Sequence, residues 1–260
     1  MAMIRSPAVA GLFYPADIQE LQHDVQQFLS HARFHDTKPK ALIVPHAGYM
    51  YSGAIAATAY ASLKAIADRI QRVVLLGPVH RVAIYGLALP SVDVFATPLG
   101  RVQLDTKLIQ EIAHLPQISV SDAAHALEHS LEVQLPFLQS VLGEFVLLPL
   151  AVGMTSAEAV AEVLEQVWGG EETLIVISSD LSHYLPYVQA QQVDYETVQS
   201  ILQFGQPIEQ AQACGNIAIN GLILTAQKYH LKPQLLDLRN SGDTAGSRDQ
   251  VVGYAAITFS

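Results

Sequence analysis

The chain has 260 residues, half of them hydrophobic, with 14 Lys and Arg against 24 Asp and Glu. Its formal charge of −10 argues against nucleic-acid binding, because that function requires a basic surface. No apolar run approaches the roughly 18 residues of a membrane span, and the N-terminus has no apolar signal segment. The single Cys214 cannot form an internal disulfide, which is typical of a reducing compartment. We therefore expect a cytoplasmic protein without a membrane partner, built as one α/β domain over residues 1–260.

Helical and strand-like patterns alternate along the chain. The first helix is predicted at 17–33, where apolar residues recur at helical spacing after Asp17, a good N-cap residue. Further helices are predicted at 52–67, 105–114, 131–142, 156–168, 188–204 and 217–230, and strands at 41–44, 73–76, 85–89, 92–95, 145–150, 174–177, 233–238 and 251–259. This alternation predicts an α/β fold with a mainly parallel sheet and helices on both faces. The last strand follows a loop instead of a helix, so we expect it to run antiparallel at an edge.

Three of the predicted strands lead into side chains that can bind a metal ion. Strand 41–44 is followed by His46, strand 73–76 by His80, and strand 174–177 by Asp180 and His183. Because ligands bind at the carboxyl ends of strands in open α/β sheets, we expect these residues to converge. Neutral imidazole is a common ligand of Fe, Cu and Zn, so His46 and His80 are candidates to share one ion. Each could instead cap its strand by bonding a backbone carbonyl.

Asp180 and His183 are candidates for proton transfer. Their spacing of three residues places them on one face of a helical turn, where Asp180 could orient a histidine and His183 could act as acid or base. The alternative is that the serines and the aspartate simply cap a short helix.

Two further polar segments could complete a site. In 128–134, Ser130 resembles the capped start of a helix, and we expect Glu132 or Gln134 to point into the site or the sheet edge. His129 shares a helical face with His125, and such a face is usually solvated. The glycine-rich loop 241–247 offers one carboxylate, Asp243. We expect Cys214 to be buried and inert, although a helix start beside it would favour its thiolate.

Several functional motifs are absent from the sequence. It has no GxGxxG fingerprint, P-loop, HExxH motif or GxSxG nucleophile elbow. These absences leave little support for nucleotide-dependent or serine-hydrolase chemistry, and we expect no organic cofactor.

Seven blocks of the sequence together resemble the Memo family. They are PAVAGLFYP (7–15), VPHAGY (44–49), LGPVH (76–80), EHSLEVQLP (128–136), SSD (178–180), CG (214–215) and GYAA (253–256). Each block alone is weak, but they occur in order over nearly the whole chain. The resemblance implies a fold similar to that of the extradiol catechol dioxygenases, which use two histidines and a carboxylate on non-haem iron.

The resemblance also implies a metal site. In the animal Memo protein that site has two histidines and a cysteine, and the histidines map onto His46 and His80. Counting back from 253–256 places the cysteine position at about Thr244, so we expect this chain to lack that thiol. Candidates to replace it include Asp243, Asp180, His183 and water, with Glu132 and His129 as further pocket residues. Two histidines and a carboxylate would suit Fe(II) with open positions.

The sequence leaves two main hypotheses for function. The first is a metal-dependent oxidoreductase that holds Fe or Cu, with Zn as the alternative, at His46 and His80. The second is a non-catalytic protein that uses an enzyme-like pocket to bind a peptide, small molecule or partner. A structural subunit with an inert pocket is a third. By resemblance, microbial Memo proteins are companions of radical-SAM and AMMECR-type proteins, which are therefore expected partners.

Overall fold

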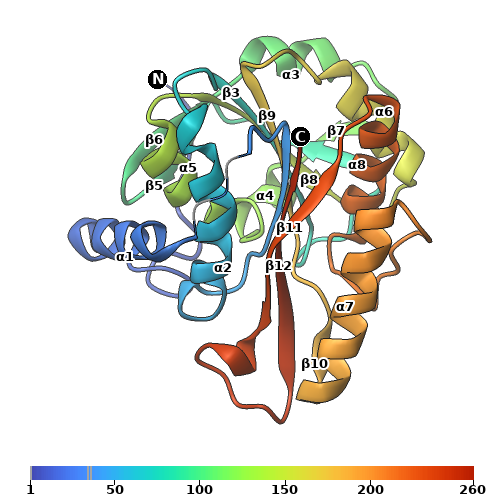
Figure 1. The fold of residues 1–260 in the computed structure, drawn as a ribbon. Helices are drawn as coiled ribbons and strands as arrows, with labels where there is room; N and C mark the ends of the chain where they lie inside the picture. The colour runs from blue at the N-terminus through green and yellow to red at the C-terminus, as the bar shows by residue number, and fades with distance from the viewer. Residues whose placement is uncertain (1, 34, 36) are drawn as a thin grey trace.

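The computed structural model describes residues 2–33, 35 and 37–260, and it shows one twisted sheet with helices on both faces (Figure 1). The helices are α1 (Ile18–His31), α2 (Tyr49–Ala61), α3 (Thr106–Ile112), α4 (Asp122–Ala126), α5 (Leu135–Leu142), α6 (Ala157–Gln166), α7 (Tyr187–Gln203) and α8 (Asn216–Lys228), with the 3₁₀ turns η1 (Ser62–Ala65), η2 (Glu132–Gln134) and η3 (Ser241–Asp243). The strands are β1 (Ile4–Arg5), β2 (Ala41–Val44), β3 (Arg72–Pro78), β4 (Leu87–Leu89), β5 (Val94–Thr97), β6 (Gly100–Leu104), β7 (Ile118–Val120), β8 (Val146–Val152), β9 (Thr173–Ser178), β10 (His183–Leu185), β11 (Pro233–Asn240) and β12 (Val251–Phe259).

The sheet is mixed but mainly parallel, which confirms the predicted α/β class. Its order is β1-β5-β6-β8-β3-β9-β2-β12-β10, with β11 beside β12, β4 beside β8 and β7 beside β4. The central strands β6, β8, β3, β9 and β2 all run parallel to their neighbours in this group. The last strand, β12, is antiparallel to β2 as expected. It is not at an edge, however, because β10 and β11 pair with it as well.

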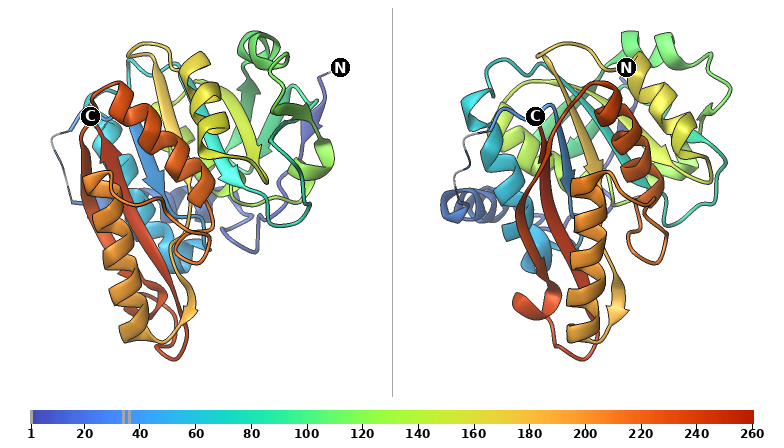
Figure 2. Two further views of the ribbon diagram at one scale, coloured as in Figure 1. Left: turned by 90° about the vertical axis from the view of Figure 1, so that its right-hand side faces the viewer. Right: turned by 45° about the vertical axis from the view of Figure 1, so that its right-hand side comes forward.

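Two apolar layers hold the helices against the sheet. Helices α1, α2 and α5 contribute to the core on one face, and α3, α6, α7 and α8 contribute to the core on the other (Figure 2). Every residue of β2 and β9 is buried, which explains why these strands read as continuous apolar runs rather than as alternating patterns. Among the described residues, no helix combines the length and the apolar character that crossing a membrane requires.

The helix starts show where local sequence rules hold and where they fail. Asp17 caps α1 as predicted, because its carboxylate accepts hydrogen bonds from the main-chain N–H groups of Gln19 and Glu20. The helix predicted at 131–142 instead begins as η2 and becomes α5 only at Leu135. The Ser130 hydroxyl does not cap it, since it donates to the Pro78 carbonyl on β3.

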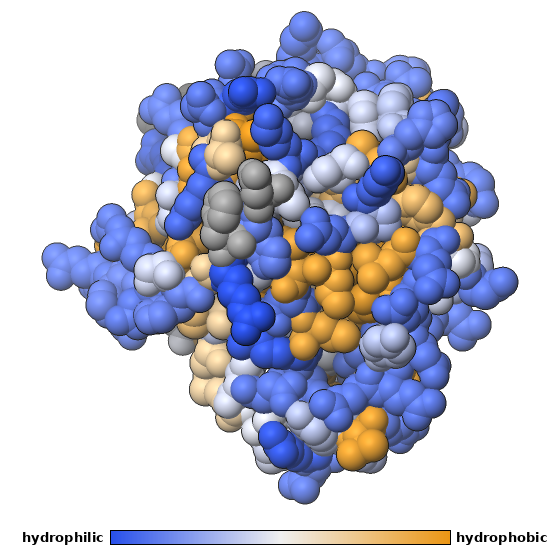
Figure 3. All heavy atoms as spheres, viewed as in Figure 1, coloured by the Kyte–Doolittle hydropathy of each residue, from blue (hydrophilic) through white to orange (hydrophobic). Residues whose placement is uncertain are grey.

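The β11–β12 hairpin extends beyond the carboxyl end of β2. Ile257 of β12 pairs with Ile43, so the earlier residues of β12 continue past the end of β2 and reach β10. The space-filling view shows a mostly polar face with an apolar patch where β11 borders α7 (Figure 3). Because β12 continues past the end of β2, the hairpin overhangs the carboxyl edge of the sheet, where the candidate site lies.

Candidate metal centre

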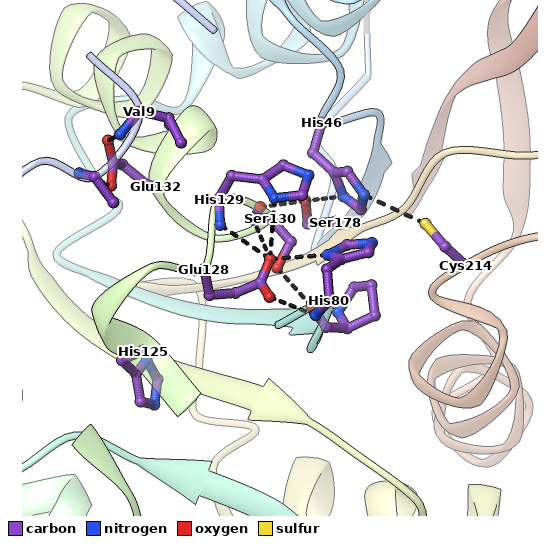
Figure 4. Close-up of polar contacts among 12 residues, drawn as sticks. Val9, His46, His80, His125, Glu128, His129, Ser130, Glu132, Ser178 and Cys214 are labelled. Atoms are coloured by element: carbon purple, nitrogen blue, oxygen red, sulfur yellow. Dashed lines mark hydrogen bonds and ion pairs between the residues drawn. The ribbon is translucent and has the colours of Figure 1, made fainter. Parts of the chain in front are cut away.

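Three histidines from three separate loops face one another at the carboxyl edge of the sheet (Figure 4). His46 follows β2, His80 follows β3, and His129 lies between α4 and η2. The ring centroids are 5.2 Å apart for His46 and His80, 5.4 Å for His46 and His129, and 4.6 Å for His80 and His129. One ligand atom from each ring lies within 4.8 Å of the others, so the three could hold a metal ion.

The sheet topology explains why these loops meet. Strands β2 and β3 flank β9 in parallel, so all three end at the same edge. The segment 128–134 crosses that edge and is tied to two of the strands. The Ser130 hydroxyl donates to Pro78 O at 2.8 Å, and the Ser178 hydroxyl at the end of β9 donates to Ser130 O at 2.6 Å. These bonds place His129 beside the two strand-end histidines.

The Glu128 carboxylate orients His80. It accepts from Nδ1 of His80 at 2.8 Å and from the main-chain N–H groups of His80, His129 and Ser130 at 2.5, 2.9 and 2.9 Å. Burial alone would raise the pKa of Glu128. The hydrogen bonds that the carboxylate accepts from His80 and from the Ser130 N–H, together with the charge of His80, outweigh burial and lower the pKa to about 2. An ionised carboxylate therefore holds the Nδ1 proton of His80 and leaves Nε2 as its free nitrogen.

His46 is the most deeply buried member of the cluster. Its Nδ1 lies 2.9 Å from the Ser178 hydroxyl, and its Nε2 lies 3.3 Å from Sγ of Cys214. Burial and the nearby His80 and His129 hold the pKa of His46 well below its usual range. Burial and His80 likewise lower the pKa of His129 to about 4. At neutral pH both rings are uncharged, which is the form that binds metal.

The donor set fits a first-row transition metal. Imidazole nitrogen binds such ions at about 2.0–2.1 Å, so two nitrogens on one ion lie at most about 4 Å apart. The ligand nitrogens of the three histidines lie within 4.8 Å of one another, so only small side-chain movements would bring them to that separation. Nδ1 of His129 is buried and makes no hydrogen bond to the described residues, although it lies 3.4 Å from Oε1 of Glu128. A buried polar atom without a hydrogen bond is costly if it serves no other purpose.

Cys214, which was expected from the sequence to be buried and inert, adds a sulfur donor beside the cluster. Its Sγ lies 3.3 Å from His46 Nε2, and its residue directly precedes Gly215, the N-cap of α8. Burial and the nearby Asp180 carboxylate raise the pKa of the thiol to about 12, so it stays protonated unless a metal displaces the proton. The structure thus corrects the expectation, based on counting to Thr244, that this chain lacks a thiol at the site.

Asp180 and His183 lie close to the cluster but do not form the expected pair. The Asp180 carboxylate accepts from the main-chain N–H of His46 at 2.7 Å, and burial raises its pKa to about 7. His183 begins β10 opposite Val252, is partly exposed, and has a pKa lowered by burial. No hydrogen bond joins Asp180 to the His183 ring among the described residues. Asp180 therefore orients the loop that carries His46 rather than the ring of His183.

Glu132 supports the site from outside it. Its buried carboxylate accepts from Nη1 of Arg5 at 2.7 Å, from the Tyr14 hydroxyl at 2.5 Å, and from the main-chain N–H groups of Ala8 and Val9 at 2.7 and 3.0 Å. Figure 4 shows this carboxylate directed toward Val9 and away from the imidazoles. Because these four contacts occupy its carboxylate, Glu132 anchors the N-terminal segment and is not a third ligand.

Asp243 and Thr244 make their contacts within or beside the η3 turn. The Asp243 side chain is exposed, and it accepts from the Tyr187 hydroxyl and from the main-chain N–H of Asn240 at 3.0 Å. The Thr244 hydroxyl donates to Ser241 O at 3.2 Å. The structure does not bring either residue into the histidine cluster, because the hairpin holds them in a turn that bonds to itself.

Three residues that shape the cluster were not predicted from the sequence. Glu128 and Ser178 were overlooked because they lie close in the sequence to the candidates Glu132 and Asp180. Nothing in their own spacing indicates a contact with the histidines. The proximity of Cys214 to His46 depends on where α8 begins against the sheet, which no local pattern reveals.

His125 was expected on a solvated face but is only 2% exposed, and its Nε2 bonds to Ala88 O.

Comparisons with known proteins agree with these features. A profile of the family described as Memo-like protein matches residues 5–258. A MEMO1 family protein of Aquifex aeolicus is 37% identical over 268 residues, covering 98% of this chain and 99% of the relative. One of Sulfolobus acidocaldarius is 35% identical over 288 residues, covering 99% of each.

A solved structure shares the fold alone. The uncharacterized protein JW3007 from Escherichia coli K12 aligns with a TM-score of 0.51 at 13% identity, over 84% of this chain and 98% of that one. The sequence relatives, by contrast, match at full length and at more than 30% identity. The chain therefore belongs to the Memo family.

Proposed function

We propose that this protein binds one redox-active transition metal ion, Fe or Cu, and acts as a metal-dependent oxidoreductase. The observation that carries the proposal is the cluster of His46, His80 and His129, in which two of the rings have a dedicated partner on Nδ1. Metal-binding histidines characteristically donate their second nitrogen to such a partner. A histidine cluster that served only to cap strands would have no need of it.

The donor types favour a soft or borderline ion. Three imidazoles with the Cys214 thiol beside them are suited to Cu, Fe or Zn, whereas Mg²⁺ and Ca²⁺ require oxygen ligands. Bound Fe or Cu would supply one-electron chemistry, and Zn is the redox-inert alternative. The same donor types, two histidines and a cysteine, are those that the family resemblance implies for the animal protein.

The remaining polar residues would control protons and geometry. Asp180 holds the main chain of His46, and Glu128 holds the ring of His80. Among the described residues, His183 is the one partly exposed histidine at this edge that lies outside the cluster, and burial lowers its pKa. A neutral imidazole there would accept a proton from a substrate hydroxyl, which makes His183 the proposed acid or base.

The test is metal analysis of protein purified without a chelating tag, followed by O₂ uptake. We expect stoichiometric Fe or Cu, and O₂ consumption by the loaded protein in the presence of ascorbate as electron donor. The His46→Ala variant, treated in the same way, should contain no metal and consume no O₂. Protein that contains only Zn would contradict the redox role, and protein that cannot be loaded with any metal would contradict the whole proposal.

A second candidate function, binding of a peptide or partner without catalysis, is favoured by the aromatic residues near His183. Tyr184 is 69% exposed, and Arg248 stacks on Tyr187 with 4.4 Å between its guanidinium carbon and the ring centroid. Exposed aromatic and arginine side chains are common anchors of protein interfaces. Partner capture that is equal for metal-free and metal-loaded protein would favour this function over the first.

A further inference from the structure

The Ser178 hydroxyl lies among three polar partners and can satisfy them in only one way. Ser178 is fully buried at the end of β9, 2.6 Å from Ser130 O, 2.8 Å from Nε2 of Gln134 and 2.9 Å from Nδ1 of His46. A hydroxyl has one proton to donate and can accept two. Because the Ser130 carbonyl cannot donate, the Ser178 proton points to it. The hydroxyl oxygen must then accept from Gln134 and from His46.

Gln134 is fixed in the same manner. Its Nε2 lies 2.9 Å from Pro45 O as well as 2.8 Å from Ser178, and its Oε1 accepts from the Tyr60 hydroxyl at 2.8 Å. A flipped amide would set its oxygen against the Pro45 carbonyl, so only the orientation with NH₂ toward Pro45 is compatible with the contacts. Gln134 and Tyr60 are both fully buried, so water cannot take the place of either partner.

We infer that Tyr60, Gln134 and Ser178 form a hydrogen-bond relay that selects one tautomer of His46, with the proton on Nδ1 and the lone pair on Nε2. The three are positioning residues, because each acts on the ring or through the next member of the relay. The selected lone pair is on the nitrogen that lies 3.3 Å from Cys214 Sγ. The consequence for metal binding rests on the proposed function, but the tautomer itself does not.

The relay differs from the device that orients His80. Nδ1 of His80 donates to the Glu128 carboxylate, a charged acceptor, whereas Nδ1 of His46 donates to a neutral hydroxyl. A neutral acceptor specifies the tautomer while stabilising the protonated ring less than a carboxylate does, because it adds no charge attraction. The buried His46 is thus presented as a neutral donor, and the partner that achieves this carries no charge into the core.

The direct test is the tautomer of His46 in metal-free protein labelled with ¹⁵N in histidine. Long-range ¹H–¹⁵N correlation spectra distinguish the protonated ring nitrogen from the bare one, and the signals that vanish in His46→Gln assign the residue. We expect Nδ1 of His46 to be protonated in the wild type. A protonated Nε2, or an exchanging mixture of tautomers, would overturn the relay, and this measurement requires no variant in the relay itself.

Variants then test whether Ser178 sets the tautomer. Ser178→Ala removes the acceptor, so we expect a mixture or a shift to the Nε2-protonated form. Ser62→Ala is the matched control, because it removes another buried serine hydroxyl that bonds only to a backbone carbonyl, Ala59 O. The control should give the wild-type spectrum. A Ser178→Ala protein that keeps the pure Nδ1-protonated form would overturn the assignment of Ser178.

Metal titration separates the relay from the function on which its consequence rests. With Zn²⁺ as probe and a chromophoric chelator as competitor, Ser178→Ala should bind about 10- to 100-fold more weakly than wild type, and Ser62→Ala should bind equally. Equal affinity of Ser178→Ala and wild type would overturn the role of the relay in metal binding. A wild type with the predicted tautomer that binds no metal would instead defeat the proposed function and leave the relay standing.

Discussion

Segments 125–134 and 241–249 are both rich in polar residues and contain only short helical turns, yet only the first builds the candidate site. In 125–134 the side chains reach outward to other elements: Glu128 to His80, Ser130 to β3, and Glu132 to the N-terminal segment. In 241–249 they bond mainly within the loop or to the start of α7. A polar loop thus becomes part of a site when buried partners on other elements hold it.

The N-terminal segment supplies the support that the second loop lacks. Arg5 forms a buried ion pair with Glu132, and its other nitrogens donate to the carbonyls of His125 and Glu128 at 2.7 Å each. One guanidinium therefore ties three points of segment 125–134 together. The loop at 241–249 has Asp243 and Arg248 on the surface, where such contacts are screened by water.

The largest expected effect is loss of metal from the cluster itself. His46→Ala and His80→Ala should each abolish measurable binding of Fe(II), Cu or Zn, because each removes one of three imidazoles. His114→Ala, an exposed histidine outside the cluster, should bind as the wild type does. Isothermal titration of the metal-free proteins checks this, and equal uptake by wild type and the His46/His80 double variant would contradict it.

The next effect tests the anchoring of segment 125–134. Glu132→Gln leaves Arg5 buried without a counter-charge, which should cost about 3–5 kcal/mol in the free energy of unfolding. Glu165→Gln is the matched control, since it breaks the exposed ion pair with Lys228 and should cost less than about 1 kcal/mol. Urea unfolding measures both, and similar losses for the two variants would show that the anchor does not support the loop.

The stability of the metal-free protein should fall on acidification because of His125. Its burial lowers the pKa to about 4, whereas the unfolded chain takes up the proton near 6.5. The unfolded state is therefore favoured progressively as the pH drops from 6.5 to 4, by about 2–3 kcal/mol from this residue. His125→Gln should lose that much less stability than wild type between pH 7.5 and 4.5 in urea unfolding. Identical pH profiles would rule out this contribution.

A smaller effect is expected from the residue that orients His80. Glu128→Gln removes the charge that holds the Nδ1 proton, and we expect metal affinity about 10- to 100-fold lower. Competition with a chromophoric chelator measures the change, and circular dichroism confirms that the variant is folded. Affinity equal to that of the wild type would mean that the carboxylate serves the loop and not the metal.

The smallest effect should come from the second loop. Asp243→Asn should leave metal affinity unchanged, because its side chain bonds to Tyr187 and Asn240 and not to the cluster. Asp180→Asn should weaken binding, since its carboxylate holds the main chain of His46. Titration of Fe(II) and Cu into both variants in the same buffer decides between them. A larger loss of metal affinity in Asp243→Asn than in Asp180→Asn would indicate that the hairpin loop supplies the third ligand.

Much of the fold and two of the three histidines of the cluster could be predicted from the sequence alone. Apolar runs followed by His46 and His80 indicated buried parallel strands, and parallel strands end at one edge by geometry. Asp17 as a helix cap could also be predicted, because capping bonds join residues two or three apart. These features depend on neighbours in the chain, so the sequence contains them directly.

The tertiary structure decided which other polar groups reach the histidines. His129, Glu128 and Ser178 belong to the site because the segment 128–134 is tied across the sheet edge. Cys214, more than 160 positions from His46, contacts it through the packing of α8, whereas Asp243 is held away by its turn. Long-range side-chain contacts of this kind leave no periodicity or spacing in the sequence, because they depend on how separate elements pack and not on the distance between residues along the chain.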